Sequence, residues 1–170
     1  MNPLSDERSS SPPSRVLVLG FGNPGRQDDG LGPAAAAEIE KLNWPSVTAR
    51  DNYQLVLEDA LEIAAHDVVW FVDAARGGTE PFEVRRVSSA TNIAFTSHLL
   101  SAQVLLAVCQ KYFESAPEAF QVGIRGYEFE FQEGLTAGAQ RNLLKALKFI
   151  QSSIATRLGS NDEYRPREQA

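Results

Sequence analysis

The segment that most constrains the fold runs from Val16 to Gly32 and joins an apolar strand, a glycine-rich turn and the start of a helix. Its first part, Val16-Leu-Val-Leu, is a continuous apolar run of the kind found in parallel strands covered on both faces. The turn Gly20-Phe-Gly-Asn-Pro-Gly25 is followed by two adjacent carboxylates, Asp28 and Asp29. The segment therefore predicts a covered parallel sheet with acidic side chains beyond the end of its first strand.

Strands and helices are predicted to alternate along the chain. Apolar runs predict strands at residues 15–20, 47–51, 68–73, 82–87 and 120–126. Helices are expected at residues 32–42, 54–65 and 136–158, and another, capped by Thr96 or Ser97, is expected to run to about Phe113. Because right-handed crossovers place helices on both faces of a sheet, this order predicts a three-layer α/β/α single domain with a mostly parallel twisted sheet.

Length and composition favour one folded unit. A chain of 170 residues with 43% hydrophobic content suits a single domain, which we place at residues 15–158. The Ser/Pro-rich head at residues 1–14 and the polar tail at residues 159–170 are expected to be poorly ordered. The single cysteine, Cys109, excludes an internal disulfide and lies in an apolar run, so we expect an inert core thiol.

Charge and hydropathy exclude several classes of partner. A formal charge of −6 gives no electrostatic reason for binding nucleic acid or an anionic membrane. No apolar run approaches the roughly 20 residues that span a bilayer. Residues 1–14 also lack the apolar core of a secretory signal. We therefore expect a cytoplasmic protein with no nucleic-acid or membrane partner.

Four polar residues are expected at the carboxyl ends of the strands, where open α/β sheets carry their functional groups. Asp29 follows the first predicted strand, Asp51 ends the second, Asp73 ends the third and His98 lies beyond the fourth. Two carboxylates and an imidazole suit a divalent first-row metal ion and leave coordination positions open for water or substrate. We therefore predict Asp29, Asp73 and His98 as metal ligands, with Asp51 as a further carboxylate.

Each of these residues also has a simpler structural explanation. Asp29 can stabilise the amino end of the following helix, Asp73 can cap a turn, and His98 can be a hydrogen-bonded residue at a helix start. The coincidence of all three favours the metal site.

Two arginines and an aromatic segment are secondary candidates. Arg76 and Arg125 follow the third and fifth predicted strands, where they can contact a substrate carboxylate or carbonyl, or simply be solvated loop residues. Residues 127–131 alternate aromatic and acidic side chains, which predicts a half-exposed strand.

Taken alone, the glycine turn is similar to motifs of two other protein families, but the residues around it fit neither family. Gly20-Phe-Gly-Asn-Pro-Gly25 has the spacing of a dinucleotide-binding turn, with Asp51 as the later acidic residue. However, Asp28 and Asp29 would repel a pyrophosphate, and the helix does not begin directly after the third glycine. Gly22-Asn-Pro-Gly is also similar to the opening of peptidyl-tRNA hydrolases, but the histidine segment that those enzymes need is replaced by Asp-Asp-Gly-Leu-Gly.

Three segments together resemble the hydrogenase maturation endopeptidases, the processing proteases of [NiFe] hydrogenases. They are residues 19–32, Val72-Asp73-Ala74, and Thr96-Ser97-His98 before an apolar run, and the resemblance spans about residues 15–155. It is specific in the first segment and weaker in the other two, which are short but occur in the right order. Asp29, Asp73 and His98 fall on the family's metal-ligand positions, and Asn23 belongs to the motif that shapes its turn.

The resemblance implies an endopeptidase that removes the carboxyl-terminal extension of a hydrogenase large-subunit precursor. Nickel already bound in the precursor would be the recognition signal, and Asp29, Asp73 and His98 would contact it; other divalent cations would fit the same ligands. Asn23, from the same motif, would lie near the substrate, and the positions of Arg76 and Arg125 after predicted strands make them further candidates for substrate contact. Asp51-Asn-Tyr, where some branches have Asp-Gly-Gly, is closer to the branch serving NAD-linked bidirectional hydrogenases. The alternative is a nickel-sensing assembly factor that uses the same ligands without cutting.

Overall fold

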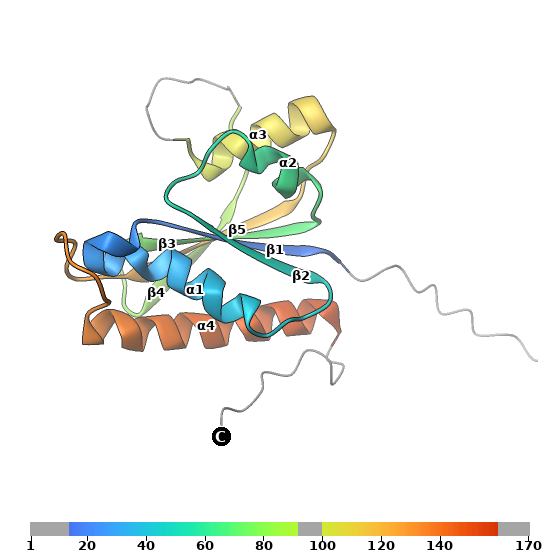
Figure 1. Cartoon of the computed structure of the whole chain (residues 1–170). Helices are drawn as coiled ribbons and strands as arrows, with labels where there is room; N and C mark the ends of the chain where they lie inside the picture. Colours follow the sequence, from blue (N-terminus) through green and yellow to red (C-terminus); the bar gives the residue numbers. More distant parts are fainter. Residues whose placement is uncertain (1–13, 92–99, 160–170) are drawn as a thin grey trace, which may run out of the picture.

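The computed structural model describes residues 14–91 and 100–159, which form a five-stranded sheet between two layers of helices (Figure 1). The elements follow in the order β1 (Val16–Phe21), η1 (Pro24–Gly30), α1 (Leu31–Glu40), β2 (Val47–Asn52), α2 (Asp59–Ala64), β3 (Val68–Ala75), β4 (Phe82–Val87), α3 (Ala102–Phe113), β5 (Glu118–Arg125) and α4 (Ala137–Leu158). The strand order is β2-β1-β3-β5-β4. The three-layer α/β prediction is confirmed.

The sheet is parallel except at one edge. β2, β1, β3 and β5 run in the same direction, whereas β4 is antiparallel to β5. β3 passes directly into β4 through a short loop, without a helix between them. A connection this short cannot return the chain to the starting end of β3, so the next strand must run the opposite way.

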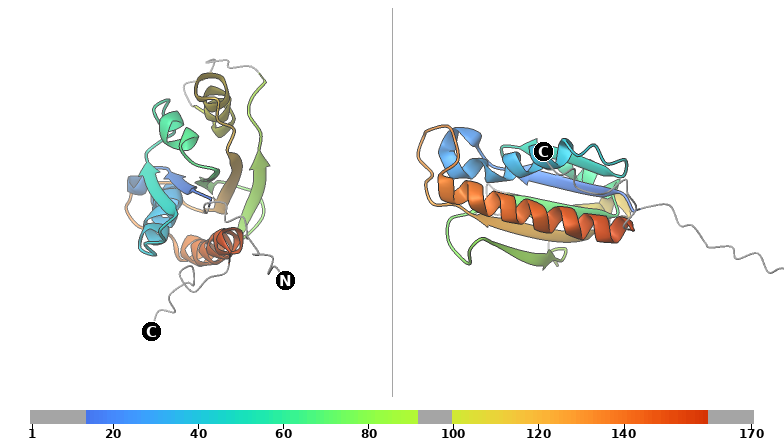
Figure 2. Two further views of the ribbon diagram at one scale, coloured as in Figure 1. Left: turned by 90° about the vertical axis from the view of Figure 1, so that its right-hand side faces the viewer. Right: turned by 90° about the horizontal axis from the view of Figure 1, so that it is seen from below.

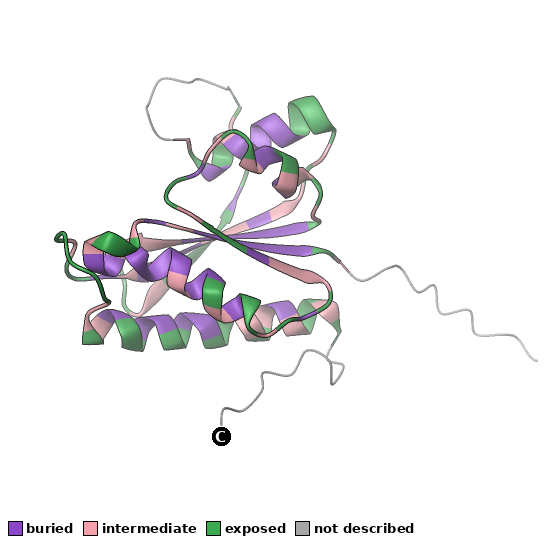
Figure 3. Cartoon of the chain, in the orientation of Figure 1, coloured by how far each residue is buried: buried purple, intermediate pink, exposed green. Residues whose placement is uncertain are grey.

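Helices cover both faces of the sheet (Figure 2), and two separate hydrophobic cores hold them to it. On one face, Val16, Val18 and Val72 pack with residues of α1 and α4. On the other face, Leu17 and Phe71 pack with residues of α2 and α3. Alternate residues of β1 and β3 therefore enter opposite cores, which explains why these strands are apolar without interruption. Figure 3 shows the same central strands as buried.

Glycines allow the start of α1 to approach the sheet closely. A Cβ on Gly20 would lie 2.0 Å from the carbonyl oxygen of Gly32, and a Cβ on Gly32 would lie 2.3 Å from that of Phe21. Neither position can carry a side chain without moving the backbone. These glycines of the motif are thus needed for helix–sheet packing.

Cys109 is buried in the α2/α3 core, as predicted. Its Sγ donates a hydrogen bond to the carbonyl oxygen of Ala60 at 3.3 Å. Burial raises the pKa of this thiol to about 11, so it is protonated and unreactive at neutral pH.

Two predicted helix starts and one predicted strand are wrong. α3 begins at Ala102 and not after Thr96 or Ser97, because Ser101 has an extended backbone and its hydroxyl accepts a hydrogen bond from the Val104 N–H. α2 begins at Asp59 and is shorter than the predicted helix. Residues 127–131 form no strand and belong to the loop between β5 and α4.

Among the helices of the described ranges, none is both long and apolar enough to cross a membrane.

Candidate active site

The sheet has a topological switch point between β1 and β3. The chain leaves β1 for β2 on one side and returns to β3 on the other side. Connections that depart in opposite directions leave a crevice at the carboxyl ends of such strands, where α/β proteins bind ligands. Asp29 follows β1, and Asp73 lies near the carboxyl end of β3. The structure therefore brings together two of the predicted site residues at this crevice.

Asp29 is held by the turn that precedes it. Its Oδ2 accepts a hydrogen bond from the Asn23 N–H at 2.9 Å, and the Asn23 Oδ1 accepts one from the Gly25 N–H at 2.9 Å. Gly22 has a φ of +142°, and a Cβ there would lie 2.0 Å from the carbonyl oxygen of Asp29. The Gly-Asn-Pro-Gly turn thus fixes the position of the Asp29 carboxylate. Asn23 shapes the turn, as the resemblance implied. Its contact with substrate remains a prediction.

Asp28, the residue next to Asp29, has an anchoring role that was not predicted from the sequence. Its side chain is fully buried, and its carboxylate accepts hydrogen bonds from the N–H groups of Tyr127, Glu128 and Thr136 and from the Thr136 hydroxyl, at 2.7–3.1 Å. Burial alone would raise the pKa of Asp28, but these hydrogen bonds lower it below the ordinary 3.8. Asp28 is thus an ionised anchor between η1 and the β5–α4 loop (residues 126–136), and it does not face the crevice.

Gln27 adds to this anchor from an unusual backbone conformation. It has a φ of 47° and a ψ of −118°, which non-glycine residues rarely adopt. Its backbone N–H donates to the Gln132 carbonyl oxygen, and its side chain bonds the carboxylate of Glu128 and the N–H of Glu130. The β5–α4 loop is therefore hydrogen-bonded to η1, the segment that also carries Asp29.

Two stacked pairs explain the alternating aromatic residues of the same loop. The Arg76 guanidinium lies 4.1 Å from the ring centre of Phe129, and the Arg26 guanidinium lies 4.9 Å from that of Phe131. Both arginines follow strands at the crevice end of the sheet. The pattern that predicted a strand instead reflects cation–π contacts that hold the loop against the site.

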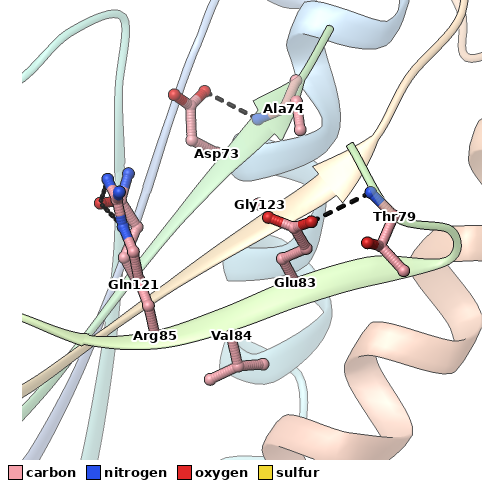
Figure 4. Close-up of a pocket in the computed structure, with 9 residues that line it drawn as sticks. Asp73, Ala74, Thr79, Glu83, Val84, Arg85, Gln121 and Gly123 are labelled. Atoms are coloured by element: carbon pink, nitrogen blue, oxygen red, sulfur yellow. Dashed lines mark hydrogen bonds between the residues drawn. The ribbon is translucent and has the colours of Figure 1, made fainter. Parts of the chain in front are cut away.

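Asp73 has an electrostatic environment that is unusual for a carboxylate. Its Oδ1 accepts a hydrogen bond from the Ala74 N–H at 2.7 Å (Figure 4). The pKa of Asp73 is raised to about 6, chiefly by burial, with the nearby charge of Asp29 adding to the rise and the hydrogen bond from Ala74 opposing it. The ion pairs formed within the described ranges involve neither Asp29 nor Asp73. Two carboxylates that lack a balancing cation are suited to bind one.

The other predicted ligands do not add to this pair within the described residues. His98 lies outside them. Asp51 lies in β2 on the same face of the sheet as Val47 and Ala49, which is the face covered by α1 and α4. There it lines a separate recess together with Pro24 and Pro33. It is thus not beside Asp73, which lies on the opposite face. Within residues 14–91 and 100–159, no group of three His, Cys, Asp or Glu side chains is arranged to hold a metal ion.

Arg125 is engaged in contacts within the protein. Its Nη1 donates to the carbonyl oxygen of Gly78 at 3.0 Å, its Nε donates to that of Gly126 at 3.1 Å, and it lies over the ring of Tyr127. Arg76 is stacked as described above. The predicted contacts of both arginines with substrate remain predictions, and their visible contacts brace the loops around the crevice.

A recess of about 400 Å³ lies beside Asp73 on the α2/α3 face of the sheet. Figure 4 shows it over the middle of β5, with Asp73 on one side and Glu83 and Arg85 of β4 on the other. The remaining lining residues include Thr79, Gln121 and Gly123. Asp73 thus borders both the crevice and a hollow large enough for part of a peptide.

Solved structures with the same fold were found, although no family model and no curated protein sequence matches the chain. The [NiFe] hydrogenase maturation protease HycI from Thermococcus kodakarensis has a TM-score of 0.65 at 22% identity, over 86% of this chain and 95% of its own. The hydrogenase maturating endopeptidase HybD from Escherichia coli has a TM-score of 0.64 at 20% identity, over 84% and 93%. The hydrogenase 2 maturation peptidase from a Thaumarchaeota archaeon has a TM-score of 0.63 at 20% identity, over 83% and 98%. These structural neighbours are maturation proteases, and the likeness establishes a shared fold.

Proposed function

We propose that this protein is an endopeptidase that removes the carboxyl-terminal extension of a nickel-loaded [NiFe] hydrogenase large-subunit precursor. The observation that carries the proposal is the pair Asp29 and Asp73 at the switch point of the sheet. The fold shared with maturation proteases and the three sequence segments that resemble them support the same activity. The preference for an NAD-linked hydrogenase remains a prediction from the sequence.

The electrostatics of the pair fit a cation supplied by the substrate. The pKa of Asp73 is raised because its charge is partly buried and lies near that of Asp29. A divalent cation between the carboxylates would remove this cost, since its charge stabilises both ionised groups. Asp29 and Asp73 would therefore contact the nickel of the precursor, with His98 as the third ligand predicted from the sequence. The bound nickel would polarise the carbonyl group of the bond to be cut.

The surrounding residues would keep this pair in place during binding. Asn23 donates to the Asp29 carboxylate, and Asp28 ties the same turn to the β5–α4 loop. Preorganised ligands bind more tightly because little freedom is lost on binding. The protein thus needs no large rearrangement of the acidic pair to receive the precursor.

The proposal is tested by the intact mass of a large-subunit precursor encoded in the same genome, after incubation with this protein. One sample of the precursor carries nickel and a matched sample does not. We expect a carboxyl-terminal peptide to be lost only from the nickel-loaded sample. Stable association without any loss of mass would instead assign the protein as a nickel-sensing assembly factor.

A further inference from the structure

Gly123 lies within β5 although nothing in the fold requires a glycine there. It does not have the positive φ that favours glycine, and a Cβ at this position would meet only the Ala75 Cβ, at 3.4 Å, which is an ordinary contact. By contrast, a Cβ on Gly20 would lie 2.0 Å from a backbone oxygen. Glycine inside a strand weakens it and often marks a place where a ligand or another backbone approaches closely. Gly123 therefore keeps a space that the protein itself does not fill.

The strand register shows where this space lies. Gly123 pairs with Asp73 of β3 on one side and with Glu83 of β4 on the other. Two residues back along β5, Gln121 pairs with Arg85. Neighbouring strands are about 4.8 Å apart, so Asp73 and Glu83 are separated by about 10 Å across the sheet. Gly123 thus forms the floor of the recess described above, between two carboxylates (Figure 4).

The walls of the recess offer both a hydrogen-bond acceptor and a donor. The Glu83 carboxylate accepts the Thr79 N–H at 3.1 Å, and hydrogen bonds from Thr79 lower the pKa of Glu83, so it is ionised at neutral pH. Arg85 is held by two hydrogen bonds, from its Nε and Nη2 to the Gln121 Oε1 at 3.2 and 2.7 Å. A peptide main chain presents N–H donors and C=O acceptors in alternation. An acceptor and a fixed donor beside a bare backbone suit such a chain.

We propose that the recess over Gly123 is a subsite for the main chain of an extended peptide, next to the bond that is cut. This inference rests on the proposed function, because Asp73 lines the recess and is also one of the two carboxylates of the acidic pair. The substrate segment would pass over Gly123 in direct contact with the β5 backbone. Glu83 would accept from one of its N–H groups, and Arg85 would donate to one of its carbonyl oxygens.

The variants Gly123→Ala and Gly123→Val test this subsite, because they fill the recess while the fold has room for their Cβ. Alanine and valine both lose less conformational freedom on folding than glycine, and valine also favours strands, so neither change should lower the melting temperature. With the nickel-loaded precursor as substrate, we expect Gly123→Val to raise KM by about tenfold or more with a smaller effect on kcat, and Gly123→Ala to have an intermediate effect. Gly77→Ala is the matched control, since a Cβ there meets no atom within 4 Å.

The outcomes separate this subsite from the proposed activity. If the wild-type protein does not shorten the precursor, the proposed function and the subsite both fail. If the wild-type protein cuts and Gly123→Val cuts with unchanged KM, only the subsite is overturned. The variant Glu83→Gln keeps an oxygen for the Thr79 N–H but removes the charge of Glu83. If this variant loses processing and the Gly123 variants do not, the subsite is also overturned, in favour of one for a cationic side chain.

Discussion

Asp28 and Thr136 join two parts of the chain that are 108 residues apart, because the Asp28 carboxylate accepts both the backbone N–H and the hydroxyl of Thr136, at 2.7 and 2.8 Å. Thr136 also caps α4, since its hydroxyl oxygen accepts the Ala139 N–H. One buried carboxylate therefore links the turn that carries Asp29 to the start of the last helix. Two adjacent aspartates of the motif thus have different tasks: Asp28 anchors the turn, and Asp29 faces the site.

Asp28→Asn is expected to lower the free energy of unfolding by about 2–3 kcal/mol, because an amide nitrogen replaces an acceptor oxygen at a fully buried side chain that faces N–H donors. Urea denaturation at pH 7 measures this loss. Glu133→Gln is the matched control, since Glu133 is an exposed acid of the same loop. The anchoring role is wrong if both variants are as stable as the wild type.

The destabilisation by Asp28→Asn should also depend on pH. Hydrogen bonds hold the pKa of Asp28 below 3.8 in the folded protein. Its contribution to stability is therefore complete above about pH 4 and is lost as the pH falls through the folded-state pKa. We expect the difference between wild type and variant to be larger at pH 7 than at pH 3. A difference that does not change with pH would show that the charge of Asp28 is unimportant.

Asp73→Asn is expected to stabilise the protein at neutral pH while removing its activity. The pKa of Asp73 is raised from 3.8 to about 6, so between these pH values the folded protein keeps a proton that the unfolded chain has lost. Stability therefore falls as the pH rises through this window, by about 2–3 kcal/mol in total. Asparagine removes this cost and retains an oxygen for the Ala74 N–H. Denaturation at pH 4 and pH 7.5 with a chelator present should show the gain only at pH 7.5.

The contact between Arg76 and Phe129 should contribute to the stability of the β5–α4 loop. A double-mutant cycle with Arg76→Gln and Phe129→Leu is expected to give a coupling energy of about 0.5–1 kcal/mol, as is usual for cation–π pairs near the protein surface. Processing by Arg76→Gln should fall much less than processing by Asp73→Asn. A loss as large as that of Asp73→Asn would assign Arg76 to substrate binding, as the sequence suggested.

His98→Ala is expected to abolish processing and leave the melting temperature unchanged, because a ligand for the substrate's nickel has no necessary part in the fold. The intact mass of the nickel-loaded precursor and a thermal unfolding curve measure the two effects. Normal processing would remove His98 from the proposed ligands. His66→Ala is the control, since His66 lies at the end of α2, where its Nδ1 contacts the Glu62 carbonyl oxygen.

The fold and the acidic pair were predictable because they depend on patterns local to the chain. Uninterrupted apolar strands and intervening helices indicate a covered parallel sheet, and the ends of such strands indicate where Asp29 and Asp73 meet. The start of α3 was predicted too early because Thr96, Ser97 and Ser101 are all suitable caps, and only the packing of the helix selects among them.

The role of Asp28 could not be read from the sequence, because it depends on a loop about 100 residues away. Asp28 and Asp29 are chemically identical, and the three N–H donors that distinguish them come from the β5–α4 loop and the start of α4. Asp51 lies on a face of the sheet that was not predicted from the sequence. Its position at a strand end is correct, but the alternation of side chains along β2 directs it to the opposite face from Asp73.

The most direct test of the central claim is a time course of the intact mass of the nickel-loaded precursor with the wild-type protein and with the Asp29→Asn variant. Asparagine keeps an oxygen that can accept the Asn23 N–H but removes the negative charge that the substrate's nickel would contact. We predict that the wild-type protein releases a carboxyl-terminal peptide and that the folded variant releases none. Equal release by both proteins would contradict a site built on the acidic pair.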